Sequence, residues 1–265
     1  MQAISIIEHL ENCGTWVNRR KTRDLVLAGN PEIEINKIGV CWMLTNKALQ
    51  QAISEGVNFI ISHENPYYEA STGPYYIYHL SALAKKELMA KYAICAYRCH
   101  DVWDKFPDYG IADVWQKIID LPFEKREISS FNSYASFKVM TVEEIALKIA
   151  KALSTYGQDA VQIFGNPKRL VTTLGMGTGA ATDVDSILAG KEVEVIVFSE
   201  DGCKSYQEIQ YCLDNKIEVI RVNHATCEIP GMFSLVDYLK DQFPVDVVYL
   251  KEGYDMVSIF AEQQN

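Results

Sequence analysis

The feature that most constrains the fold is an alternation, along the whole chain, of short apolar β-rich runs with segments of helical periodicity. In the first half we expect strands at residues 38–44, 57–62 and 92–99, with helices at residues 47–55 and 79–90 between them. Strands separated by helices pair in parallel through crossover connections. The sequence therefore predicts an α/β protein with mixed, largely parallel sheets.

The second half repeats this alternation. Thr141 is expected to cap a helix over residues 142–155, because acids follow it in the first turn. Residues 120–136 lack a clear period and are expected to hold the boundary between two α/β lobes, residues 1–125 and 126–265, with the last strands returning to the first lobe. Further strands are expected at 161–164, 170–174, 193–198, 218–222, 245–250 and 257–260, and further helices at 113–119, 181–188, 206–215 and 232–242.

Composition excludes several classes of protein. No apolar run approaches the ~20 residues that a membrane span needs, and the first residues lack a basic, apolar leader, so we expect a cytoplasmic protein without membrane contact. The net charge of -10 disfavours nucleic acid as a partner. Seven cysteines without a Cys-x-x-Cys pair are expected as reduced thiols.

Three of the five histidines directly follow or end predicted strands, and each has a carboxylate one or four residues away. The carboxyl ends of strands are where open α/β sheets bind ligands, and a spacing of four places two side chains on one helical turn. A single pair of this kind is more often a surface hydrogen bond, but three together favour a metal site for Zn, Mn, Fe or Mg. The segments are His63-Glu64, His100 with Asp104, and His224 with Glu228.

The order and internal spacing of these segments resemble the GTP cyclohydrolase 1 type 2 family, also called Nif-three-like proteins. That family has a His-His-Pro segment after a strand, then His-x-x-x-Asp, and late in the chain His-x-x-x-Glu. The resemblance implies two α/β lobes, two divalent metal ions in the cleft between them, and a ring-like homohexamer. Its metal ligands would map onto His63, Glu64, Asp104, His224 and Glu228, and the turns at residues 175–179 and 199–202 also lie where the family has comparable features.

One departure concerns the ligands themselves, because Glu64 stands where the family has its second histidine. A carboxylate can ligate the same ions. If Glu64, Asp104 and Glu228 all ligate, three negative charges face the metals where the family arrangement has two. That charge would raise the pKa of metal-bound water and favour harder ions such as Mn, Fe or Mg.

The resemblance implies metal-assisted hydrolysis of a small-molecule substrate, a nucleotide or a related compound, by a metal-bound water. Glu64, Glu228 and His100 are the candidate catalytic residues, with His100 as a ligand, an orienting group behind the ligands or a proton shuttle. The alternative is a non-catalytic metal-binding protein with a regulatory or scaffold role. The two differ in whether the metal keeps an exchangeable water position.

Two further segments have open interpretations. The loop at residues 66–78 holds five tyrosines, which either stack a nucleobase or pack over a sheet or subunit interface. The glycine-rich turn Gly175 to Gly179 either cradles phosphate or is a plain tight turn, and it matches no nucleotide-binding fingerprint. His9 and His79 fall inside helical patterns and are expected to be structural.

Overall fold

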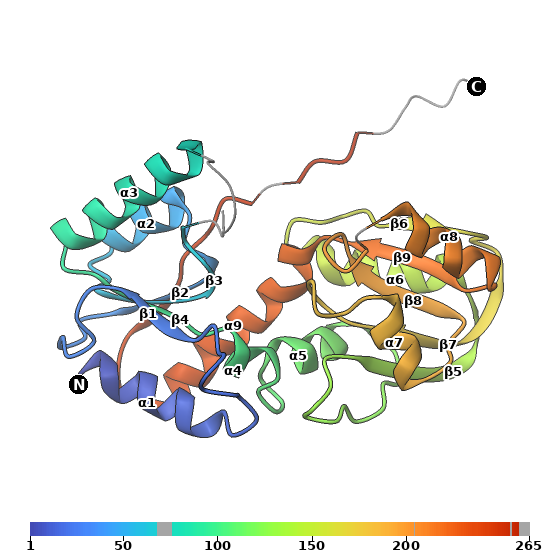
Figure 1. The fold of residues 1–265 in the computed structure, drawn as a ribbon, viewed down its shortest axis with the longest axis horizontal. Helices are drawn as coiled ribbons and strands as arrows, with labels where there is room; N and C mark the ends of the chain where they lie inside the picture. The colour runs from blue at the N-terminus through green and yellow to red at the C-terminus, as the bar shows by residue number, and fades with distance from the viewer. Residues whose placement is uncertain (68–75, 204, 255, 260–265) are drawn as a thin grey trace. The chain divides into compact units, whose positions relative to one another are not determined.

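The computed structural model describes residues 1–67, 76–203, 205–254 and 256–259. The chain forms two compact units. Unit 1 combines Met1–Ile111 with Gly231–Gly253, and unit 2 combines Ala112–Pro230 with the C-terminal stretch from Tyr254. Each unit contains one five-stranded sheet (Figure 1).

The sheet of unit 1 has the strand order β1-β4-β3-β2-β10. β1 runs antiparallel to β4, and the other neighbours are parallel, so β2, β3 and β4 end at the same edge. Its strands are β1 (Leu25–Ala28), β2 (Ile38–Met43), β3 (Phe59–Glu64), β4 (Cys95–Arg98) and β10 (Val247–Tyr249).

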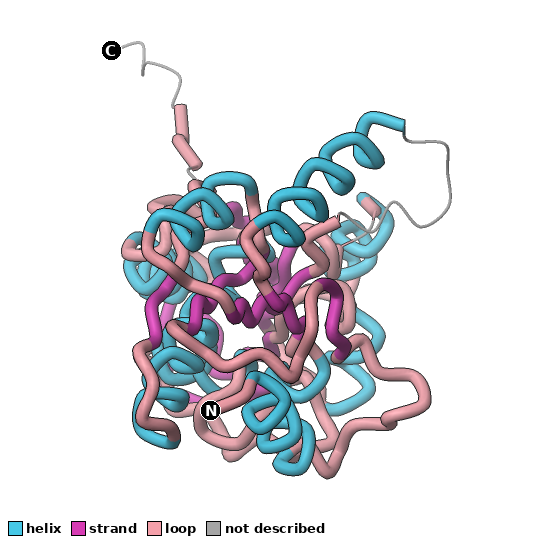
Figure 2. The backbone as a smooth tube through the Cα atoms, turned by 90° about the vertical axis from the view of Figure 1, so that its left-hand side faces the viewer, coloured by secondary structure: helices cyan, strands magenta, loops and turns pink. Residues whose placement is uncertain are grey.

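Helices cover both faces of this sheet because its inner strands are apolar on both sides (Figure 2). Ile61 and its neighbours on one face pack with residues of α1 (Ala3–Cys13), α4 (Asp101–Asp104) and the C-terminal part of α9 (His224–Gln242). Ile60 and its neighbours on the other face pack with residues of α2 (Asn46–Ser54) and α3 (Tyr76–Lys91).

The sheet of unit 2 has the order β5-β7-β8-β9-β6, with parallel pairing in the centre and an antiparallel strand at each edge. One face packs with α5 (Ile111–Ile118) and α6 (Val142–Ser154), and the other with α7 (Val184–Gly190) and α8 (Tyr206–Asp214). The two mixed, largely parallel sheets confirm the predicted fold class. The strands are β5 (Ser133–Thr141), β6 (Gln162–Phe164), β7 (Leu170–Met176), β8 (Val195–Ser199) and β9 (Glu218–Val222).

Several local expectations were wrong. β1 and β5 were not predicted, and both are antiparallel edge strands in which polar or exposed positions interrupt the apolar pattern. Helix α9 begins at His224, eight residues before its expected start, and continues through Pro230 because buried Ala225 and Cys227 hold its first turns in place. The expected strand at the C-terminus is not formed at Val257–Ile259, which are largely exposed, and residue 260 lies outside the described part.

One prediction falls largely on residues that the structure does not describe. Most of the tyrosine-rich segment, residues 68–75, lies outside the described residues, and Tyr76–Tyr78 belong to α3. Within the described residues, no helix is both long enough and apolar enough to cross a bilayer.

Candidate metal centre

One edge of the sheet in unit 1 positions the first group of predicted site residues. His63 and Glu64 are the last two residues of β3, and Arg98 ends the neighbouring parallel strand β4, opposite Ser62. Two residues after β4, His100 precedes the first residue of the short helix α4. Because parallel strands end together, the predicted strand-end residues of this unit meet at one place.

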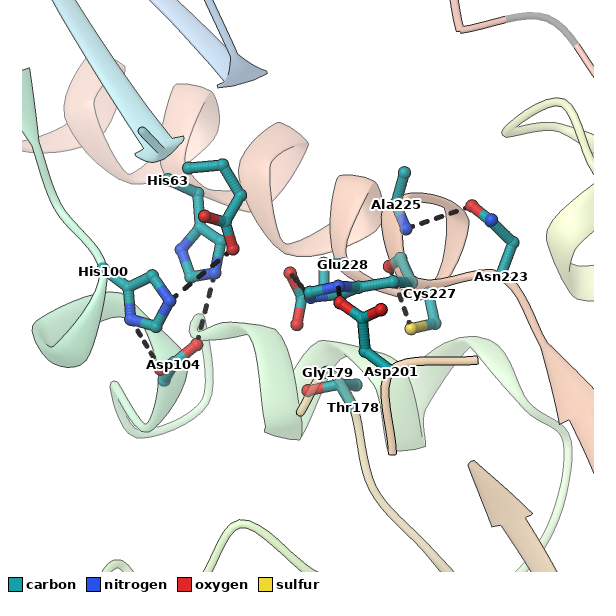
Figure 3. A network of polar contacts seen from close by, with 12 residues as sticks. His63, His100, Asp104, Thr178, Gly179, Asp201, Asn223, Ala225, Cys227 and Glu228 are labelled. Atoms are coloured by element: carbon teal, nitrogen blue, oxygen red, sulfur yellow. Dashed lines mark hydrogen bonds and ion pairs between the residues drawn. The ribbon is translucent and has the colours of Figure 1, made fainter. Parts of the chain in front are cut away.

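Asp104 lies between two imidazoles at this edge. Its Oδ1 is 3.4 Å from Nε2 of His63, and its Oδ2 is 3.1 Å from Nδ1 of His100 (Figure 3). The two rings stack with centroids 4.3 Å apart and an interplanar angle of 10°. All three residues are buried, and each offers a donor atom within 4.8 Å of the other two.

These separations match those of donors around a metal ion. Bonds of about 2.0–2.2 Å at angles between octahedral and tetrahedral values place two N or O donors roughly 3.0–3.5 Å apart. The His63–Asp104 and His100–Asp104 distances of 3.4 and 3.1 Å fall in that interval. Two imidazoles and a carboxylate also form a donor set that Zn, Mn and Fe accept.

The same group also forms favourable ion pairs when no metal ion is bound. Burial works against protonation of His100, but the carboxylates of Asp104, Asp101 and Glu64 outweigh it, so the pKa of His100 is raised well above its ordinary value. A protonated His100 then pairs with Asp101 at 3.0 Å and Asp104 at 3.1 Å, both through Nδ1. A metal at this place would therefore compete with a proton for the ring.

Glu64 is held by a buried arginine. Its Oε2 accepts a hydrogen bond from Nη2 of Arg98 at 3.0 Å, while Nε of Arg98 donates to the backbone carbonyl of His63 at 3.1 Å. The side chain of Arg98 is 3% exposed. The other carboxylate oxygen of Glu64 lies 3.7 Å from Nε2 of His100. Arg98 thus fixes both consecutive residues at the end of β3.

This ion pair revises the charge balance expected from the sequence. Arg98 pairs with Glu64 and offsets its negative charge within unit 1. The argument for harder ions, which rested on an uncompensated Glu64, loses its basis.

Unit 2 holds the second group of predicted residues, at the start of α9. Nε2 of His224 lies 3.0 Å from Oε2 of Glu228, which is buried one helical turn further on. The turn after β7 approaches the same pair: Gly179 has φ +59°, and a Cβ there would come within 2.9 Å of Nε2 of His224 and 3.0 Å of Oε1 of Glu228 (Figure 3). The glycine-rich turn therefore packs against the predicted ligands.

The structure thus brings together His63, Glu64, His100 and Asp104 within unit 1, and His224 with Glu228 within unit 2. That all five predicted ligands serve one cleft stays a prediction.

Comparison with known proteins places the whole fold in a family. The sequence model of the family Duf34/NIF3 (NGG1p interacting factor 3) matches residues 3–253 of this chain. The chain belongs to the Duf34/NIF3 family. A "GTP cyclohydrolase 1 type 2 homolog" of Chlamydia pneumoniae is 21% identical over 268 residues, covering 94% of this chain and 98% of that protein. These matches confirm the resemblance inferred from the histidine segments.

Solved structures share the fold at low sequence identity. Staphylococcus aureus protein SA1388 superposes with a TM-score of 0.79 at 14% identity, covering 98% of this chain and 99% of that one. A Bacillus cereus protein related to NIF3 has a TM-score of 0.77 at 11% identity, with the same coverage. The two-sheet α/β architecture is therefore that of the Duf34/NIF3 family.

Sequence reasoning missed the residues that support the site in this Duf34/NIF3 protein. Asp24, buried, accepts hydrogen bonds from the backbone N–H groups of His100 at 2.6 Å and Val102 at 3.2 Å, which fixes the start of α4. Arg98 was passed over although it stands two residues before His100, at the end of a predicted strand. For Asp24 no local signal exists, because its partner lies 76 residues away in the chain.

The two cysteines beside the histidine segments lie in the apolar cores of their units. Cys99 belongs to the apolar core of unit 1. Cys227 is buried and donates its S–H to the carbonyl of His224 at 3.1 Å. Burial raises the pKa of both thiols well above the ordinary value, which opposes thiolate formation.

Proposed function

We propose that this Duf34/NIF3 protein binds divalent metal ions through the imidazoles and carboxylates at its strand ends. The observation that carries the proposal is Asp104, whose two oxygens face the nitrogens of two buried histidines at metal-donor separations. His63 would be the ligand of this pair, and His100, which lies on the other oxygen of Asp104, would hold that carboxylate in place.

As the full ligand set we propose the five residues predicted from the sequence, with two ions bound. His63, Glu64 and Asp104 come from unit 1, and His224 and Glu228 from unit 2. The imidazoles and the Arg98-neutralised Glu64 support Zn, Mn or Fe as the ion.

We further propose hydrolysis of a nucleotide or related small molecule as the reaction. Bound divalent ions would lower the pKa of a coordinated water and polarise a substrate oxygen. Among the chain's own residues, Asp104 orients both imidazoles, and His100 holds a proton between Asp101 and Asp104. GTP is the first substrate to test, because a related protein is named a GTP cyclohydrolase 1 type 2 homolog.

The test is elemental analysis of the purified protein and of Asp104→Ala, with Asp185→Ala as a control that removes an exposed acid elsewhere. We expect stoichiometric metal in the unmodified protein and in the control, and its loss from Asp104→Ala. Absence of metal from the unmodified protein after reloading would refute metal binding. Metal-loaded protein is then screened with GTP and other nucleotides, and bound metal without turnover would favour the non-catalytic, regulatory role.

Family membership also supports a homohexamer. Six chains of 30.0 kDa together have a mass of about 180 kDa. Light scattering coupled to size exclusion measures this mass directly, and a monomer at micromolar concentration would refute the proposed ring.

A further inference from the structure

The turn that follows β8 carries two carboxylates that face the start of α9. Glu200 accepts hydrogen bonds from the backbone N–H of His224 and from Nδ2 of Asn223, both at 2.8 Å. This pair of contacts ties the turn to the first residue of the helix. The next residue, Asp201, is thereby placed beside the ring of His224 rather than its backbone.

Asp201 contacts one nitrogen of that ring, and Glu228 the other. Oδ2 of Asp201 lies 2.8 Å from Nδ1 of His224, and Nε2 of His224 lies 3.0 Å from Oε2 of Glu228. Both neighbours of the ring are carboxylates, which can only accept hydrogen bonds. An ion bound between Nε2 and Glu228 would displace a proton there and leave the Nδ1–H group to donate to Asp201.

We propose that Asp201 is a positioning residue that fixes the tautomer and orientation of His224 for metal binding through Nε2. The inference rests on the metal site proposed above and adds a residue that the sequence comparison with the family did not assign. In metal sites the second ring nitrogen of a ligating histidine is generally held by a carboxylate or carbonyl, and loss of that partner weakens metal binding.

The backbone around His224 supports the same orientation. Gly179 lies close to Nε2 of His224, since a Cβ at this position would come within 2.9 Å of that atom. A side chain at Gly179 would therefore press on the Nε2 edge of the ring and on Glu228. Asp201 on the Nδ1 edge and the glycine turn on the Nε2 edge together hold the imidazole in one plane.

A plain surface ion pair is the competing interpretation, because the side chain of Asp201 is 53% exposed. Such a pair contributes little to stability and would have no effect on metal affinity. The two interpretations therefore differ in what the removal of the Asp201 charge does to metal binding, and not in what it does to folding.

The experiment measures zinc affinity of the full chain by competition with a chromophoric chelator. Asp201→Asn is expected to bind Zn²⁺ about 10- to 100-fold more weakly, and Asp201→Glu to recover most of the affinity. Asp214→Asn is the matched control, because it removes the same charge from another acid of unit 2 that accepts one side-chain hydrogen bond. Its affinity should equal that of the unmodified protein.

A second readout is the tautomer itself. Long-range ¹H–¹⁵N spectra of the zinc-loaded protein should show a protonated Nδ1 on His224 and a metal-shifted Nε2. Unchanged zinc affinity in Asp201→Asn, or zinc on Nδ1, would overturn the role of Asp201 while the metal site stands. Failure of the unmodified protein to bind zinc, manganese or iron would instead overturn the proposed function and this inference with it.

Discussion

Replacing Arg98 by methionine keeps most of the side-chain volume but removes the guanidinium that holds the end of β3. The loss includes two hydrogen bonds that this cation donates, one to the carboxylate of Glu64 at 3.0 Å and one to the carbonyl of His63 at 3.1 Å. A hydrogen bond that involves a charged group contributes roughly 1.5–3 kcal/mol. Because Glu64 is 20% exposed, water relieves part of the penalty on its unpaired charge, and we expect a total loss of about 3 kcal/mol.

Glu64→Gln attacks the same pair from the other side and should cost about 2 kcal/mol, because it leaves the buried arginine without its counter-charge. The double variant should then be at least about 1 kcal/mol more stable than the sum of the two single losses predicts. Lys168→Met is the control, since Lys168 pairs with Glu143 on the surface and its loss should cost less than about 1 kcal/mol.

Urea unfolding followed by tryptophan fluorescence is well matched to this measurement. Three of the four tryptophans, Trp16, Trp42 and Trp103, belong to unit 1, so the signal reports chiefly on the unit that contains the ion pair. A chelator removes any contribution from bound metal. Additive losses in the double variant, or a loss below about 1 kcal/mol in Arg98→Met, would refute the view that Arg98 and Glu64 act as one buried unit.

Two other predictions concern the remaining parts of the site. Gly179→Ala should lower the free energy of unfolding by about 1–2 kcal/mol through left-handed backbone strain. It should also weaken zinc binding, because the new Cβ presses on His224. Gly56→Ala has the same backbone strain but open space around its Cβ, so it should bind zinc normally. In chelator, the stability that His100 contributes should be complete below about pH 6.5 and decline as pH rises through its raised pKa, because a proton shared with Asp104 is lost. Urea unfolding across pH should show this decline, and an equal decline in His100→Asn would contradict the assignment.

The extent to which the sequence predicted the site follows from the range of the interactions involved. His63, His100 and His224 were found because each stands at the end of a run whose period identifies a strand, and the partners of His100 and His224 lie four residues further on. Periodicity and i,i+4 spacing are local properties. The family resemblance predicted that the three segments belong to one metal site, but it did not predict which side chains contact one another.

The supporting residues could not be predicted in the same way. Arg98 reaches Glu64 across 34 residues of chain, and Asp201 reaches His224 across 23. Arg98 and Glu64 meet only because parallel strands end at the same edge of the sheet. Asp201 and His224 meet only because the turn after one strand lies beside the helix that follows the next strand. The edge strand β5 was missed for a related reason, since its pairing with β7 rather than its own composition makes it a strand.

The sequence by itself determined the α/β class and the strand-end histidines, because alternation of side-chain period is set within a few residues. It also supplied the i,i+4 pair of His224 and Glu228, since one helical turn is enough to bring them together. Only the tertiary structure decided that Arg98 neutralises Glu64 and that Asp201 faces His224. Charge balance and ring orientation depend on atoms a few ångströms apart that the chain brings from distant positions, and local patterns carry no information about such distances.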